Sequence, residues 1–197
     1  MAKNDIGKLR KVFTNASKKQ VKENLTSSVP FKSFLVENAG LIITHPFLKP
    51  LFENLQLIEG GQFDSYFNQE KAAVYLHYLV FNQLPVDQSS IALNKIICGI
   101  PLEKAIDFSQ FQFSTAEIFE AATLKEAIIS HWAVLKNTSN ESFTASYLQR
   151  NGVLNFKDGV WTLAIERKAI DILLNQLPWE LSIIRFPWSK NLLQVSW

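Results

Sequence analysis

The sequence predicts an α+β fold in which a mainly helical domain is followed by a small antiparallel β-sheet with one intervening helix. Three observations predict it. Apolar residues recur at helical spacing, with capping residues at the expected ends, up to Gly152. The Asp158-Gly159 pair that follows is typical of a two-residue hairpin turn. Hydrophobic residues make up 47% of the 197 positions and charged residues 19%, which favours a packed core over general disorder.

The start of the chain is set apart by its charge. Residues 1–33 contain eight basic residues against Asp5 and Glu23, a net charge of +6, so the remainder carries about −4. We therefore expect residues 1–30 to form a basic, partly mobile N-terminal arm. Residues 31–197 are expected to form a compact α+β domain, with a helical part over 31–152 and a hairpin-helix-strand part over 153–197.

The arm allows two interpretations. It either keeps the chain soluble or binds nucleic acid, an anionic membrane or an acidic protein wall. Apolar residues from Ile6 to Ala16 recur at helical spacing and predict a short amphipathic helix within it. The basic residues that would make the contact are Lys8, Arg10, Lys11, Lys18, Lys19 and Lys22.

The first element expected after the arm is a buried helix. The run from Phe34 to Ile43 is nearly all apolar and is too long for a typical strand. Pro46 and Pro50 lack a backbone N–H and must break or kink the helix. A second short helix then carries Leu55 on its apolar side and stops at Gly60-Gly61.

Four further helices are indicated by periodicity and caps. One covers Gln69–Asn82, and the next covers Asp87–Cys98, capped by its aspartate and ended by the following glycine. The Ser114–Glu117 stretch has the form of a capping box and opens the longest helix, for which Ile118 and Trp132 are among the expected inward residues. The Thr138–Glu141 stretch also has the form of a capping box, and it opens a helix that ends at Gly152, before the hairpin.

The hairpin turn fixes a register. With Asp158-Gly159 at the turn, Phe156 pairs with Trp161 and Leu154 pairs with Leu163. This pairing puts the four apolar side chains on one face, and a shift by one residue would destroy that separation.

The end of the chain is expected to add a helix and two strands. Apolar residues from Ile170 to Leu177 form the stripe of the helix, which Pro178 closes, and residues 181–186 and 192–197 follow as strands. Residues 166–168 and Asp171 are expected to form a solvated helix start.

Catalytic and metal-binding motifs are not found in the sequence. His45, His77 and His131 are isolated from one another and fit no metal pattern. The interpretation we favour is that His45 caps the Pro-kinked turn and that His131 hydrogen-bonds beside Trp132. The single cysteine, Cys98, is expected to be a small buried thiol. We therefore predict that the chain is not an enzyme and has no cofactor and no metal.

Aromatic residues are the conspicuous candidates for function. Proline precedes two tryptophans and fixes the backbone in front of each ring, as an interface anchor requires. The same rings could instead pack the sheet against the helices. Stacking on nucleic acid would need more basic neighbours than Arg185 and Lys190. The candidate docking or structural aromatics are Phe47, Trp132, Trp179, Trp188 and Trp197.

A series of phrases from Val36 to the end of the chain resembles one known family. They are VENAGLIITHPFLKPLFENLQL, AAVYL, LNKIICGIPL, HWAVLKNTS, SYLQRNGVL and WTLAIERKAIDILLNQLPWELSIIRFPW. Their order and separations are similar to those in the C-terminal region of the tape-measure proteins of contractile injection systems.

The resemblance implies a structural protein of a phage-tail-like particle that is made in the cytoplasm and lies in the lumen of the tail tube. It would act in tube-length control or anchoring. Its partners would be tail-tube, spike-baseplate or cap proteins, with possible self-association, and not nucleic acid or membrane.

Length bears on which of these roles is expected. Even a wholly helical chain of this length would reach only about 300 Å, so a compact domain cannot measure a long tube. We therefore expect either the terminal domain of a longer protein or a short relative that acts as an anchor or adaptor. The first is favoured, because the basic arm stops where the resemblance begins.

Overall fold

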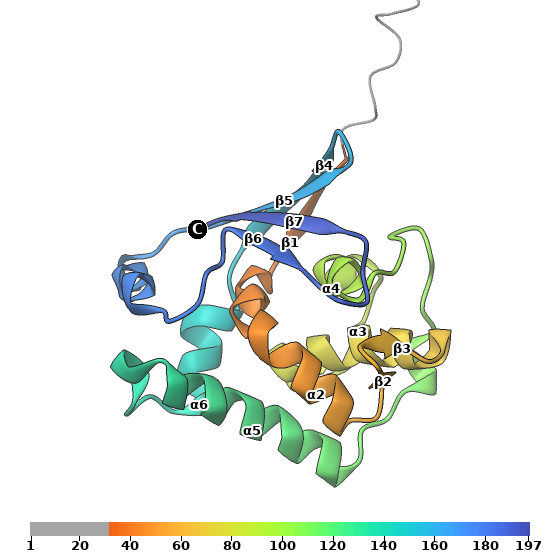
Figure 1. The fold of residues 1–197 in the computed structure, drawn as a ribbon, viewed down its shortest axis with the longest axis horizontal. Coiled ribbons are helices and arrows are strands. Elements are labelled where there is room, and N and C mark those ends of the chain that lie inside the picture. The colour runs from red at the N-terminus through yellow and green to blue at the C-terminus, as the bar shows by residue number, and fades with distance from the viewer. Residues whose placement is uncertain (1–31) are drawn as a thin grey trace, which may run out of the picture. The chain divides into compact units, whose positions relative to one another are not determined.

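The computed structural model describes residues 32–197, which form a five-stranded sheet with helices on one of its faces (Figure 1). The predicted α+β class is confirmed. The predictions for the basic arm and its amphipathic helix lie outside the described residues.

The sheet has the strand order β1-β4-β5-β7-β6. Its strands are β1 (Lys32–Val36), β4 (Gly152–Lys157), β5 (Val160–Ile165), β6 (Ile183–Arg185) and β7 (Leu192–Ser196). All neighbouring strands are antiparallel except β5 and β7, which are parallel. The expected purely antiparallel sheet is therefore corrected to a mixed one, because the chain first forms the outer strand β6 and then turns back to insert β7 beside β5.

The apolar run after the arm was predicted to form one helix, but it forms two elements. Its first part is β1, which pairs Phe34 with Leu154 and Val36 with Gly152 at the edge of the sheet. Its second part is the 3-10 helix η1 (Ala39–Phe47). Pairing with a strand more than a hundred residues away thus overrides the local preference for a helix.

A glycine lets η1 lie directly against a later turn of the chain. A Cβ atom on Gly40 would overlap the carbonyl oxygen of Tyr147. Any larger residue would force the two backbones apart, so this contact fixes the centre of the helical region.

The predicted end of the second short helix at Gly60-Gly61 and the predicted start of the third helix at Gln69 are both corrected. Helix α2 (Leu48–Asn54) ends before a small hairpin of β2 (Ile58–Glu59) and β3 (Gln62–Phe63), which was not predicted and turns at Gly60-Gly61. Helix α3 (Tyr66–Phe81) follows.

The next helical segment begins with η2 (Ser89–Ile91) and continues as α4 (Ala92–Cys98). Asp87 accepts the amide N–H groups of Ser89 and Ser90 at 2.9 Å each, and Gly99 ends the helix with φ of 75°. Both predicted helix ends are confirmed.

Helix α5 (Thr115–His131) opens with the predicted capping box, in which Ser114 and Glu117 bond each other's backbone amides. Ile118 is 42% exposed rather than inward, whereas Trp132 is fully buried. The short helices around it are η3 (Phe108–Gln110) and η4 (Ala133–Leu135).

The helical region closes with α6 (Asn140–Phe143) and the π-helical turn η5 (Thr144–Leu148). Ser139 caps α6, within the predicted capping stretch. The helix does not reach Gly152, which begins β4 instead.

The β4–β5 hairpin has the predicted register. Phe156 pairs with Trp161 and Leu154 with Leu163, and Asp158 and Gly159 at the turn have φ of 52° and 82°. The predicted last helix is the 3-10 helix η6 (Ala169–Gln176). No helix among residues 32–197 combines the length and apolar character needed to cross a membrane.

Candidate functional site

Three tryptophans near the end of the chain hold this part of the fold in place, two against the helices and one over a buried ion pair. The first, Trp188, follows β6 and is 8% exposed. Its indole N–H donates to the carbonyl oxygen of Ile97 in α4 at 2.9 Å. Its ring lies 5.1 Å from that of Phe52 and 5.6 Å from those of Phe63 and Phe186, measured between centroids. We call this group the Trp188 ring cluster, and it is almost entirely apolar.

The second tryptophan, Trp179, makes the equivalent contact at η1. Its indole N–H donates to the carbonyl oxygen of Ile43 at 3.1 Å. Its ring centroid lies 5.2 Å from that of Phe47, which in turn lies 5.4 Å from His131 at the end of α5. Each Pro-Trp pair therefore places an indole against a helix and satisfies its N–H there.

The third tryptophan, Trp197, covers a buried ion pair. Arg150 is fully buried, and its guanidinium makes two bonds to the carboxylate of Asp171, at 2.6 and 2.9 Å. It also donates to the carbonyl oxygens of Ser146 and Glu166. The indole N–H of Trp197 donates to the same carboxylate at 3.0 Å, and its ring lies 5.4 Å from the guanidinium carbon.

The prediction that Asp171 belongs to a solvated helix start is therefore wrong. Its carboxylate accepts bonds from Arg150, Trp197 and the amide of Lys168. Burial alone would raise the pKa of Asp171, but these bonds outweigh burial and hold the pKa below its ordinary value of 3.8. Arg150 was not singled out from the sequence, because its neighbours Gln149 and Asn151 are polar and give no local sign of a buried role.

The five aromatics named from the sequence do not gather in one patch. Phe47 and Trp179 touch each other, Trp188 and Trp197 lie in separate contacts, and Trp132 is fully buried with its ring centroid 4.8 Å from that of Tyr147. These contacts are those of packing residues. Docking of another protein on the five rings stays a prediction.

His45 and His131 make local hydrogen bonds, as the sequence predicts for these two. Nδ1 of His45 lies 3.2 Å from the carbonyl oxygen of Ile42, and Nδ1 of His131 lies 2.7 Å from that of Ala127. Burial lowers the pKa of His45 and of His77. Cys98 is buried, as predicted, and burial raises the pKa of its thiol. Within residues 32–197, no three His, Cys, Asp or Glu side chains stand close enough to hold a metal ion.

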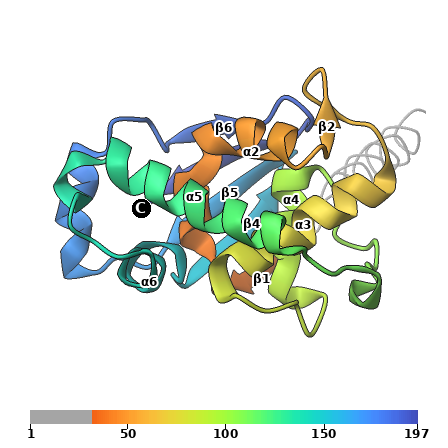
Figure 2. The same cartoon turned by 90° about the horizontal axis from the view of Figure 1, so that it is seen from below.

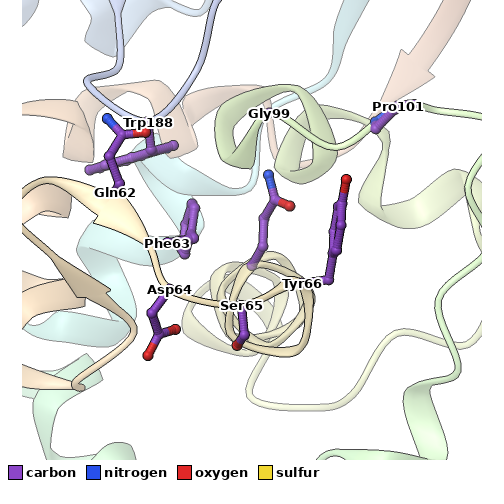
Figure 3. A pocket seen from close by; sticks show the side chains of 9 residues that line it. Gln62, Phe63, Asp64, Ser65, Tyr66, Gly99, Pro101 and Trp188 are labelled. Carbon is purple, nitrogen blue, oxygen red and sulfur yellow. The ribbon is translucent and has the colours of Figure 1, made fainter.

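A hollow beside the β2–β3 hairpin has a volume of about 430 Å³. Figure 3 shows Trp188 and Phe63 on one side of it and Tyr66 and Pro101 on the other. Tyr66 is 73% exposed, and the ammonium of Lys104 lies 4.1 Å from its ring centroid.

The polar groups of this hollow hold its walls together. Gln62 donates to the carbonyl oxygen of Pro187 at 2.7 Å, and Gln69 donates to that of Cys98 at 2.8 Å. Asp64 accepts a bond from Asn68. The lining residues include neither a histidine nor a pair of carboxylates, so the hollow can receive a side chain but has no evident acid–base pair.

Comparison with known proteins identifies the family. A family model described as contractile injection system tape measure protein matches residues 3–197, which is nearly the whole chain. The chain therefore belongs to the contractile injection system tape measure protein family. No curated protein and no solved structure matches it. Because the match begins at residue 3, the basic segment is part of the matched region, and the expectation that the resemblance begins only after the arm is corrected.

Proposed function

We propose that the chain is a non-enzymatic structural component of a contractile injection particle that acts by anchoring, within the wider task of tube-length control. The observation that carries the proposal is the family match over residues 3–197. The family supports a structural role in such a particle. Anchoring as the particular role is inferred from the shape and contacts of the described residues.

The dimensions of the described residues favour an anchor over a ruler. Their longest helix, α5, has 17 residues, which is about 26 Å at a rise of about 1.5 Å per residue. The Trp188 ring cluster and the Trp179 contact join the sheet region to the helices at separate points, and the Arg150–Asp171 pair ties the start of β4 to η6. A domain held together in this way stays compact and does not extend along a tube.

The charged groups support a non-enzymatic role. Asp171 is tied up in an ion pair, Asp87 and Glu117 serve as helix caps, and Lys95 is buried with its ammonium bonded to carbonyl and amide oxygens. Groups that are satisfied by neighbours of this kind stabilise the fold and are poorly placed to exchange protons with a substrate.

The partners follow from the role. The chain would be made in the cytoplasm and would lie in the lumen of the assembled particle, in contact with tail-tube, spike-baseplate or cap proteins. The five candidate aromatics would act there as internal anchors that shape the docking surface.

Deletion of the gene, followed by electron microscopy of the particles, tests the role. We expect few particles or tubes of irregular length, and restoration by the unaltered chain. Particles of normal number and tube length in the deletion strain would contradict the proposal.

An insertion separates anchoring from measuring. Twenty helix-forming residues placed in the Thr26–Pro30 stretch would add about 30 Å to a ruler. We expect tube length to stay unchanged, as anchoring requires. A tube that lengthens in proportion to the insertion would instead assign the chain the measuring role.

A further inference from the structure

Charge is divided between the two regions of the described body. The helical region, residues 37–149, holds six lysines against twelve acidic residues, a net charge of −6. The sheet region, residues 32–36 and 150–197, holds seven basic residues against four acidic ones, a net charge of +3. The folded body is therefore a dipole made of two oppositely charged layers.

Among residues 32–197, each layer ends in a surface that no other described element covers, and the two surfaces lie on opposite sides of the body. Figure 1 shows the sheet at one side with the α-helices beneath it, and α5 lies far from the sheet. Figure 2, seen from below, shows α5 in front and the sheet behind. A surface on the outer side of the sheet and a surface on the outer side of α5 therefore face in opposite directions.

The outer sheet face is partly apolar and lacks carboxylates. Leu35, Val153 and Ala164 lie side by side across β1, β4 and β5, and Leu35 is 81% exposed. Ile183 on β6 is 63% exposed, since its neighbour Ile184 is the one that points inward. Lys157 and Arg185 supply positive charge at outward positions, and no residue in the five strands is Asp or Glu.

The outer side of α5 is partly apolar and acidic. Phe119 is 68% exposed and Ile118 is 42% exposed. Glu120 and Glu126 lie on the same helix, whereas Lys125 is buried.

Most other lysines of the helical region are occupied by local contacts. Lys49, Lys71 and Lys104 are each paired with a glutamate, and Lys95 is buried. The helical region therefore offers a surface whose carboxylates exceed its available cations.

We propose that the outer sheet face docks on the α5 face of a second copy of this chain, head to tail. Two sheet faces would bring positive charge to positive charge, and two α5 faces would bring negative to negative. Only the unlike pair matches both the charge and the exposed apolar residues. Because each copy keeps one free sheet face and one free α5 face, the contact is heterologous and can continue into a stack.

The size of the face sets the strength of the contact. Five strands about 4.8 Å apart and about five residues long present roughly 400 Å². A contact of that size buries about 800 Å² in total, below the roughly 1,200 Å² of a stable pair. The association is therefore weak in dilute solution, rises with concentration and falls with salt.

Three matched substitutions test the contact in the full chain by sedimentation velocity over a concentration series. Ile183→Glu alters the sheet face, Phe119→Glu alters the α5 face, and Ile172→Glu on η6 is the control. The three sites are 63%, 68% and 70% exposed, so each change adds one charge at a comparable surface position. Circular dichroism checks that each variant is folded.

We expect the unaltered chain and Ile172→Glu to associate alike, and more weakly at high salt. Ile183→Glu and Phe119→Glu should each associate at least tenfold more weakly. Mixed in equal amounts, these two variants should form a one-to-one pair and nothing larger, because each supplies the face that the other lacks. The two altered faces cannot pair with each other, because each carries a carboxylate in place of its exposed apolar residue.

Several results would overturn the proposal. They are an unaltered chain that stays monomeric throughout the series, a variant that associates as the unaltered chain does, and a mixture that remains monomeric. Salt-sensitive association that survives both substitutions would assign the contact to the basic segment of residues 1–31 instead. The inference deepens the self-association expected from the family resemblance and does not rest on anchoring. Because purified protein is measured, its failure is distinct from a failure of the particle experiments above.

Discussion

The Trp188 ring cluster and the Arg150–Asp171 pair stabilise the fold by different physics. The ring cluster joins the sheet region to the helices, whereas the ion pair ties the start of β4 to η6 within the sheet region. Around Trp188, four aromatic rings exclude water and one N–H is satisfied by Ile97. Around Arg150, two opposite charges are removed from water and held by geometry. Truncating a side chain in an apolar cluster lowers the free energy of unfolding in proportion to the volume removed. Removing a buried ion pair lowers it most when only one of the two charged partners is removed.

The largest effect is expected from removing half of the buried pair. Asp171→Ala leaves the fully buried guanidinium of Arg150 without its carboxylate, and should lower the free energy of unfolding by about 3–5 kcal/mol. Urea denaturation measures it. The double variant Arg150→Met with Asp171→Leu should recover much of the loss, because it leaves no unpaired charge. A double variant as unstable as Asp171→Ala would show that packing, not charge, dominates here.

The ring cluster should respond in a graded way. Trp188→Ala removes the ring and leaves a cavity between α2, α4 and the sheet, and should cost about 3–4 kcal/mol in free energy of unfolding. Trp188→Phe keeps an aromatic ring and should cost markedly less. The same denaturation measures both variants. If both lose the same free energy of unfolding, the contribution of Trp188 comes from its hydrogen bond and not from its ring.

Acid should distinguish the two contacts. The folded-state pKa of Asp171 lies below its ordinary value of 3.8, so its pairing contributes stability above that pH, and the contribution is lost as pH falls through the folded-state pKa. The stability difference between the unaltered chain and Asp171→Asn should therefore shrink below about pH 4. The difference for Trp188→Phe should stay constant over the same range. Denaturation curves from pH 3 to 7 make the comparison, and a constant difference for Asp171→Asn would contradict it.

The smallest effect isolates one hydrogen bond. Trp179→Phe removes the N–H that donates to Ile43 while keeping a ring against Phe47, and should cost about 0.5–1.5 kcal/mol in free energy of unfolding. A loss above about 3 kcal/mol would mean that the ring itself is irreplaceable at this point.

Local signals explain which elements could be predicted. The Asp158-Gly159 turn, the Ser114–Glu117 capping box and the Gly99 helix end act within a few residues, and all three are present in the structure. Each depends on backbone angles or hydrogen bonds that neighbouring residues alone decide. The buried state of Cys98 was also predictable from its apolar surroundings.

By itself, the sequence determined the α+β class, the hairpin register and the likeness to the tape-measure family. Only the tertiary structure decided that Lys32–Val36 is a strand, that β7 is parallel to β5, and that Arg150 meets Asp171 under Trp197. The physical reason is that these features depend on contacts between residues far apart in the sequence. An apolar run is compatible with a helix or a buried strand until a partner strand is available, and an arginine is solvated until the fold brings it a carboxylate.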